Sequence, residues 1–285
     1  MKKASWWQLE PDGQLVCRLC PRQCRIEEGK TGFCRVRERR DDTLWSLNYG
    51  EVSSIALDPV EKKPLQHFMP GKKILSVGSW GCNLACQFCQ NYSIAQLRPT
   101  VNKITPKELT ELAVKLVGEN NIGVAYTYAE PLVWYEFVLE TAQLIRQAGL
   151  KNVLVSNGYI EAEPLKELAP WLDAANIDLK GFDDSFYQTL CASGGAEPVK
   201  RTIAALHETC HVEVTTLIIP GSNDSEEHME RLAAWLAAVD RTIPLHISRY
   251  FPRYKMVVPA TDPACVRQLA KIAARYLTFV HTGNL

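Results

Sequence analysis

Three closely spaced cysteines are the residues of this chain best suited to chemistry. Cys82, Cys86 and Cys89 lie in the segment GSWGCNLACQFCQN, residues 78–91, with the spacing Cys-x3-Cys-x2-Cys. Soft thiolates are the preferred ligands of iron–sulfur clusters, and three of them hold three corners of a cubane. Because no fourth cysteine lies nearby, one iron would stay open to another ligand. A zinc-bound loop is the alternative interpretation.

A second group of cysteines lies near the start of the chain. Cys17, Cys20, Cys24 and Cys34 follow one another with spacings of x2, x3 and x9. Four thiolates complete either a structural zinc site or a closed [4Fe-4S] cluster. A small loop-rich segment needs such a metal to fold, and disulfides are disfavoured in a reducing cytosol. The sequence leaves zinc and a second cluster as open alternatives.

The remaining cysteines and the densest basic stretch have plainer interpretations. Cys191, Cys210 and Cys265 are expected to be small buried hydrophobic side chains. Four arginines lie close together but are interrupted and followed by acids, so they are expected to form a solvated face. They are Arg35, Arg37, Arg39 and Arg40.

From about residue 73 onward, strand-like and helix-like stretches alternate, which predicts an α/β fold with a parallel sheet. The expected strands are 74–80, 122–128, 152–157, 174–180, 212–219 and 243–250. Six such units are fewer than the eight of a closed TIM barrel. We therefore predict a partial (βα)6 TIM-like barrel over residues 73–285, with an open doubly wound sheet as the second choice. In either fold the active site gathers at the carboxyl ends of the strands.

Residues 1–72 break this alternation and are rich in cysteine, arginine, glycine and turn signals. They are predicted to form a small N-terminal four-cysteine metal-binding module with strand-like pieces at 43–49 and 51–57. The boundary is expected at the turn of residues 69–72. After it, Thr105, Pro106 and Glu108 have the types of an N-cap, a first-turn proline and an N3 glutamate, which predicts a helix start.

The cysteine triplet, with Phe88 before its third cysteine and a strand before its first, resembles the signature of the radical S-adenosylmethionine (SAM) superfamily. The resemblance implies that the open iron of a [4Fe-4S] cluster binds SAM. It further implies reductive cleavage of SAM to methionine and a 5′-deoxyadenosyl radical, which abstracts a hydrogen atom from a substrate. An electron donor such as flavodoxin or ferredoxin is the implied partner.

Polar residues at two strand ends fit this resemblance. The segment YTYAEP, residues 126–131, replaces the glycine-rich acidic motif usual in the superfamily. Glu130 is expected to bind the SAM ammonium group, because a charge-assisted hydrogen bond is stronger than a neutral one. Thr127 and Tyr128 are expected to assist it. Ser156 and Asn157 end the next strand and suit the SAM ribose or carboxylate, with simple turn chemistry as the alternative.

Later strand ends supply further candidates. Asp178 and Lys180 lie two residues apart and so share one face of a strand, where buried charges must be paired or functional. The same Asp-Leu-Lys occurs in activating enzymes of glycyl-radical enzymes, and the resemblance places both residues near SAM and substrate, with a mutual ion pair as the alternative. His246, Ser248 and Arg249 are candidates for contacts to SAM or substrate.

Several longer stretches resemble one branch, the radical SAM member of the AmmeMemoRadiSam system, which is similar to pyruvate formate-lyase activating enzyme. They include CRLCPRQC (17–24), DPVEKKPLQHFMPG (58–71), DLKGF (178–182) and HISRYFPRYKM (246–256). This resemblance implies Memo-type and AMMECR-type partner proteins. Members usually continue into a short cysteine-pair tail, whereas this sequence ends at Leu285.

Composition narrows the function classes. The 32 basic and 32 acidic residues balance, so nucleic acid is not favoured as a partner. No apolar run approaches the roughly 20 residues of a membrane span, and the N-terminus does not resemble a secretory signal, so a cytoplasmic protein is expected. A radical SAM enzyme is the leading hypothesis. The alternatives are an activating enzyme for a glycyl-radical protein and a non-catalytic iron–sulfur or zinc interaction protein.

Overall fold

A mostly parallel eight-stranded sheet organises the protein, which the computed structural model describes over residues 1–285. In sheet order the strands are β16 (Val280–Gly283), β15 (Leu245–Arg249), β14 (His211–Ile218), β13 (Ala174–Asp178), β12 (Lys151–Ser156), β11 (Asn121–Tyr126), β9 (Lys73–Gly78) and β8 (Ser54–Pro59). All neighbours from β9 to β16 pair in parallel, and β8 pairs with β9 in the antiparallel direction. The α/β partial-barrel prediction is thereby confirmed.

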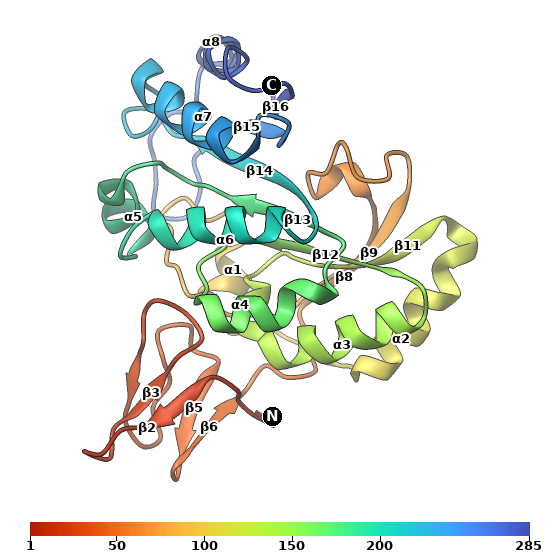
Figure 1. Ribbon diagram of the computed structural model, residues 1–285. Coiled ribbons are helices and arrows are strands. Elements are labelled where there is room, and N and C mark those ends of the chain that lie inside the picture. The colour runs from red at the N-terminus through yellow and green to blue at the C-terminus, as the bar shows by residue number, and fades with distance from the viewer.

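Helices connect the parallel strands, and Figure 1 shows α3, α4, α6 and α7 along one face of the sheet. The α-helices are α1 (Tyr92–Ala95), α2 (Pro106–Lys115), α3 (Tyr135–Gln147), α4 (Ala162–Leu168), α5 (Asp184–Cys191), α6 (Glu197–His207), α7 (Glu226–Asp240) and α8 (Pro263–Ala273). The predicted capping box is present at α2, where Thr105 accepts from the Glu108 N–H and Glu108 accepts from the Thr105 N–H. These local signals fix helix starts, while the buried faces of the helices hold them against the sheet.

The sheet has two more strands than the sequence predicted. β16 was missed because it is a four-residue strand with polar residues. β8 lies within the residues predicted to form the N-terminal module, yet it pairs with β9 along six residues. Sheet pairing therefore crosses the boundary expected near residue 72.

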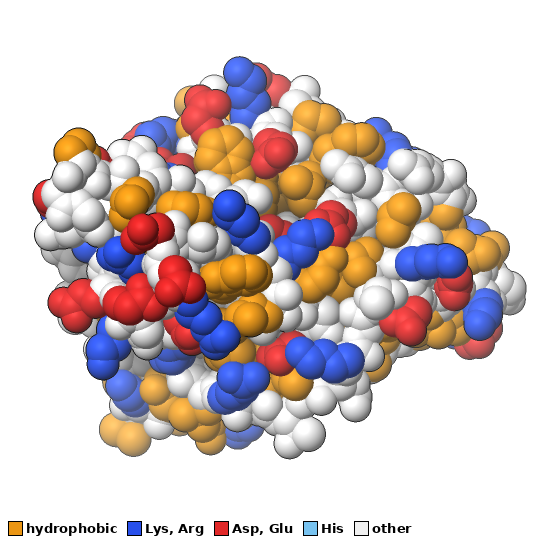
Figure 2. Space-filling view, turned by 90° about the horizontal axis from the view of Figure 1, so that it is seen from below, with side chains coloured by type: hydrophobic (Ala, Val, Ile, Leu, Met, Phe, Trp, Pro, Cys, Tyr) orange, Lys and Arg blue, Asp and Glu red, His pale blue; other side chains and the backbone are white.

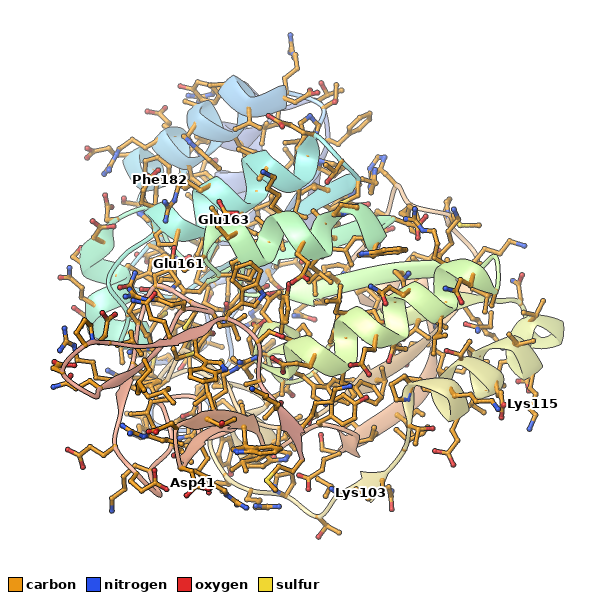
Figure 3. The ribbon with its side chains drawn as sticks, turned by 60° about the horizontal axis from the view of Figure 1, so that its bottom comes forward. Asp41, Lys103, Lys115, Glu161, Glu163 and Phe182 are labelled. Atoms are coloured by element: carbon orange, nitrogen blue, oxygen red, sulfur yellow. The ribbon has the colours of Figure 1, made fainter.

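The cysteine-rich N-terminus forms small antiparallel sheets beside the barrel (Figure 1). One contains β2 (Trp7–Leu9), β3 (Leu15–Cys17) and β4 (Arg25–Ile26), and the other β1 (Lys2–Lys3), β6 (Thr43–Ser46) and β5 (Arg37–Arg40). The short strands β7 (Glu51–Val52) and β10 (Asn102–Lys103) pair with each other. Figure 3 shows Glu161, at the start of α4, beside this region, and its backbone N–H donates to Leu19 O at 3.1 Å.

One predicted surface feature is wrong. Arg37 was expected on a solvated face, but its side chain is 1% exposed and pairs with Glu136 of α3 at 2.7 Å. The strand β5 turns Arg37 toward the barrel, while Arg40 at the end of the same strand is exposed. A buried charge needs a partner, and the ion pair supplies one across the contact between module and barrel.

Figure 2 shows basic, acidic and hydrophobic side chains interspersed on one face, as the balanced composition leads one to expect. None of the helices has the length and apolar character required to pass through a bilayer.

Candidate functional site

A cavity of about 390 Å³ opens at the carboxyl ends of the barrel strands. Parallel strands bring their carboxyl ends to one edge, so residues distant in sequence meet there. Eleven of the candidate site residues line it: Cys82, Cys86, Cys89, Thr127, Tyr128, Glu130, Ser156, Asn157, Asp178, Lys180 and Ser248. Their meeting is the main structural support for a common site.

The cysteine loop follows β9 and is held by backbone contacts. The N–H of Leu84 donates to Cys82 Sγ at 3.3 Å, and the N–H of Ala85 donates to the carbonyl of Cys191 at 3.0 Å. Gly81, with φ +90°, packs so closely on the preceding module that a Cβ would lie 2.7 Å from Cys34 O. A larger residue at position 81 would therefore displace the loop that carries the three thiols.

The donor set of this loop suits an iron–sulfur cluster. Cys82, Cys86 and Cys89 are unpaired, and all three line the cavity. Burial raises the pKa of Cys89 to about 11, which is a cost that a bound cationic cluster would offset. No three cysteine, histidine or carboxylate side chains already stand in a metal-holding arrangement, so the thiols must reorient to ligate.

Glu130 is buried at the centre of the cavity wall. Its Oε1 accepts from Ser156 Oγ at 2.7 Å and from the Leu132 N–H at 3.0 Å, while Oε2 accepts from the Asn157 N–H at 2.9 Å. Burial raises the pKa of Glu130 to about 7, and these hydrogen bonds oppose the rise. A carboxylate held this rigidly in a buried wall is prepared to receive a cationic or N–H-bearing ligand.

Asn157 joins this carboxylate to the cysteine loop. Its Nδ2 lies 3.6 Å from Cys82 Sγ and donates to Asn83 Oδ1 at 2.9 Å. Asn83 Nδ2 in turn donates to the carbonyl of Tyr159 at 2.6 Å. Ser156 and Asn157 thus bind other cavity residues in addition to forming the turn after β12.

Asp178 and Lys180 form an ion pair at the end of β13. Lys180 Nζ lies 2.7 Å from Asp178 Oδ2, and the side chains of Lys180 and Asp178 are 16% and 36% exposed. Burial alone would lower the pKa of Lys180, but Asp178 and Cys86 raise it well above its usual value. The mutual pairing and the position on the cavity wall, which were alternatives in the sequence analysis, occur together.

Tyr128 connects the cavity to residues that the sequence analysis did not single out. Its backbone has φ +69°, and its hydroxyl donates to Asp58 Oδ2 at 3.0 Å. Lys63 Nζ pairs with the same oxygen at 2.7 Å. Polar lining residues missed from the sequence are Lys62, Lys63, Gln90, Asn91, Gln96, Thr215 and Asn284. The stretch DPVEKKP contains Asp58, Lys62 and Lys63, but no local sequence signal assigns them to the cavity.

His246 and Arg249 lie elsewhere. His246 Nε2 pairs with the buried Glu213, near the amino end of the strands, and its ring stacks on His281. Arg249 Nε donates to the carbonyl of Thr261 at 2.7 Å. Neither residue lines the cavity, so the structure gives no support to their predicted contacts with SAM or substrate.

The other seven cysteines lie outside the large cavity. Cys17, Cys20, Cys24 and Cys34 line a separate enclosed cavity of about 10 Å³ in the N-terminal module. Cys191 is fully buried, as predicted, and its thiol contacts Cys86, which places it behind the cysteine loop. Cys210 and Cys265 are only partly buried.

Comparison with known proteins agrees with this geometry. The Radical SAM superfamily profile matches residues 78–236. The chain is 39% identical over its whole length to an uncharacterized protein of Methanocaldococcus jannaschii, of which it covers 86%. It is 26% identical to the pyruvate formate-lyase-activating enzyme of Clostridium pasteurianum, over 54% of this chain and 65% of that one. The structure of Streptococcus suis SuiB bound to S-adenosylmethionine is similar in fold, with a TM-score of 0.59 at 15% identity, over 74% of this chain and 52% of that one.

Proposed function

The chain belongs to the radical SAM superfamily, and from this premise we propose that Cys82, Cys86 and Cys89 hold its [4Fe-4S] cluster beside a SAM site centred on Glu130. Superfamily membership and its enzyme relatives make the protein an enzyme, which removes the non-catalytic alternative. The observation that carries the proposal is the meeting of three unpaired thiols and a buried, hydrogen-bonded carboxylate in one cavity.

The chain's own residues divide the work of binding. When bound, the reduced cluster and SAM together supply a 5′-deoxyadenosyl radical, which abstracts a hydrogen atom from the substrate. Glu130 would accept hydrogen bonds from the SAM amino group, and Ser156 and Asn157 hold that carboxylate in place by donating to it. Thr127 and Tyr128 complete the wall on the side of β11. The cavity would hold SAM and substrate close together, which favours hydrogen transfer from the substrate over side reactions.

Asp178 and Lys180 are proposed to act beside the reacting atoms. Lys180 stays protonated because Asp178 pairs with it at 2.7 Å. A charged ammonium at this point orients an electron-rich group of SAM or substrate, and Asp178 fixes where that ammonium points. Their placement on the cavity wall next to the cysteine loop supports this role.

The substrate class has a second candidate. The similarity to the Clostridium pasteurianum pyruvate formate-lyase-activating enzyme favours hydrogen abstraction from a glycine of a partner protein. The sequence resemblance to the AmmeMemoRadiSam branch instead favours a substrate delivered with Memo-type or AMMECR-type proteins. In both cases we propose a cytoplasmic enzyme that takes its electron from a flavodoxin or ferredoxin.

A cleavage assay tests the proposal. Anaerobically reconstituted protein is incubated with SAM and a strong reductant, and 5′-deoxyadenosine and methionine are measured. Both products are expected in equal amounts, rising when the true substrate or partner is added. Absence of 5′-deoxyadenosine from protein carrying about four irons would overturn the proposal.

A further inference from the structure

The four-cysteine cavity of the N-terminal module, as it stands, has space for a single ion and none for a cluster. Its volume is about 10 Å³, close to the space of one water-sized atom. A zinc ion with four thiolates at about 2.3 Å needs only such a space, whereas a cubane inserts four irons and four sulfides between the cysteines. The cavity beside Cys82, Cys86 and Cys89 has a volume of about 390 Å³, which is enough for a larger group.

The walls of the small cavity leave little room for expansion. Gly32 lines it, and a Cβ added there would lie 3.3 Å from Ile26 Cδ1, which is tighter than an ordinary contact. Cys17, Cys20 and Cys34 are buried, and Ile26 closes another side. Four thiolates around a closed ion are the arrangement of structural zinc sites, and these thiols, like the three of the other cavity, must reorient slightly to reach it.

Two arginines line the cavity, but only one of them lacks a carboxylate partner. Four thiolates and one Zn²⁺ carry a net charge of −2, Arg22 donates to backbone carbonyls, and Arg37 is already paired with Glu136. A four-cysteine cluster has the same charge in its oxidised form, so charge alone does not separate the two metals. The available volume does, and it favours zinc.

The small cavity also shares a wall with the loop that carries Cys82. Asn83 lines the small cavity, and its amide binds the Asn157 side chain that lies beside Cys82 Sγ. The guanidinium of Arg22 donates to the carbonyls of Asn83 and Ala192. The carbonyl of Cys34 abuts Gly81, the residue before Cys82.

We propose that Cys17, Cys20, Cys24 and Cys34 bind one zinc ion, and that this zinc module positions the catalytic cysteine loop through Arg22 and Cys34. With zinc bound, the module presents a rigid face to Gly81 and Asn83. Arg22 is a positioning residue, since it contacts the loop backbone and none of the reacting atoms. The zinc assignment stands independently of the proposed chemistry, whereas the positioning role rests on it.

Metal analysis of anaerobically reconstituted protein tests the zinc assignment. We expect about one zinc and about four irons per chain. About eight irons without zinc, or four irons without zinc, would overturn it. Cys20→Ala should lose the zinc, and Cys210→Ala, a free cysteine outside both cavities, should keep it. Retention of zinc by Cys20→Ala would also contradict the site. Zinc without iron or 5′-deoxyadenosine would refute the proposed function and leave the zinc site standing.

Arg22→Ala tests the positioning role without touching a metal ligand. The variant should retain one zinc, because the four thiols remain. Its SAM-bound reduced cluster should give a changed electron paramagnetic resonance spectrum, and SAM cleavage should fall about 100-fold, the cost of a small displacement near reacting atoms. Arg18→Ala in the same module, where Arg18 binds only Glu10 and Gln23, is the matched control. An unchanged spectrum and rate in Arg22→Ala would overturn the positioning role.

Discussion

The two cysteine-lined cavities of this protein differ in room and in what surrounds the thiols. The catalytic cavity has three cysteines and about 390 Å³, and a carboxylate, amides and lysines from several strands line it. The N-terminal cavity has four cysteines and about 10 Å³, and it is enclosed largely by its own module. An open metal site with spare volume can bind a reactant, whereas a zinc ion held by four thiolates has no open position for one.

The difference shows why cysteine number alone does not define a function. Both groups lie on loops, apart from Cys17 at the end of β3, and all seven cysteines are free thiols. What separates them is the fold around them. The barrel brings several strand ends to one group, and the small sheets of the module close over the other.

The largest expected effect comes from the catalytic cavity. Cys86→Ala removes one of the three proposed cluster ligands, so 5′-deoxyadenosine formation should fall to background and the iron content should fall below about four atoms per chain. Zinc should stay bound, because Cys86 does not line the N-terminal cavity. Product formation and both metals are measured, with Cys265→Ala as the control cysteine. Full activity in Cys86→Ala would contradict the assignment of the cluster to this cavity, and with it the contrast between the two groups of cysteines.

The contact between the two regions is the next target. Arg37→Met leaves Glu136 buried without its partner and should cost about 3–5 kcal/mol in the free energy of unfolding. Replacing Glu136 by Leu as well should restore most of that stability, since the uncompensated charge is gone. Urea unfolding measures both variants, and Arg40→Ala on the exposed end of the same strand should change stability by less than about 0.5 kcal/mol. A small effect of Arg37→Met would show that the module and barrel are coupled by other contacts.

A pH effect should appear only in the catalytic cavity. Burial raises the pKa of Glu130 to about 7, and in the proposed site its ionised form is the one that would accept from the SAM amino group. Affinity should therefore be present above pH 7 and be lost as the pH falls through it, about tenfold between pH 8 and pH 6. The SAM dissociation constants of Glu130→Gln and of the wild type are measured at each pH. Ionisation of SAM itself affects both constants equally, so it cancels in their ratio. A ratio independent of pH would exclude Glu130 from the site.

The smallest effect is expected at Arg249. The sequence predicted that it contacts SAM or substrate, but its guanidinium binds Thr261 and lies outside the cavity lining. Arg249→Ala should change the SAM dissociation constant by less than about 1 kcal/mol, or roughly fivefold, because no contact of the cavity is lost. Isothermal titration with SAM under anaerobic conditions measures it. A large loss of affinity would show that the SAM site extends to Arg249 at the end of β15.

The sequence was most informative where a local signal carries its own physics. The cysteine spacing predicted a cluster loop, and the capping residues Thr105 and Glu108 predicted the start of α2. Short apolar stretches between helix-like segments predicted the six central strands, because parallel strands buried on both faces are hydrophobic along their whole length. It failed for β16, which is short and polar, and for Arg37, whose burial depends on a partner 99 residues away.

By itself, then, the sequence determined the ligand types, the strand-and-helix order and the residues at the strand ends, since each follows from spacing and local propensity. Only the tertiary structure decided which strand-end residues share a cavity. It brought Glu130, Asn157 and Lys180 together with the cysteine loop, added Lys63, and turned His246 toward Glu213. It also decided the volume around each group of thiols. Those outcomes depend on the packing of distant segments, which spacing along the chain does not encode.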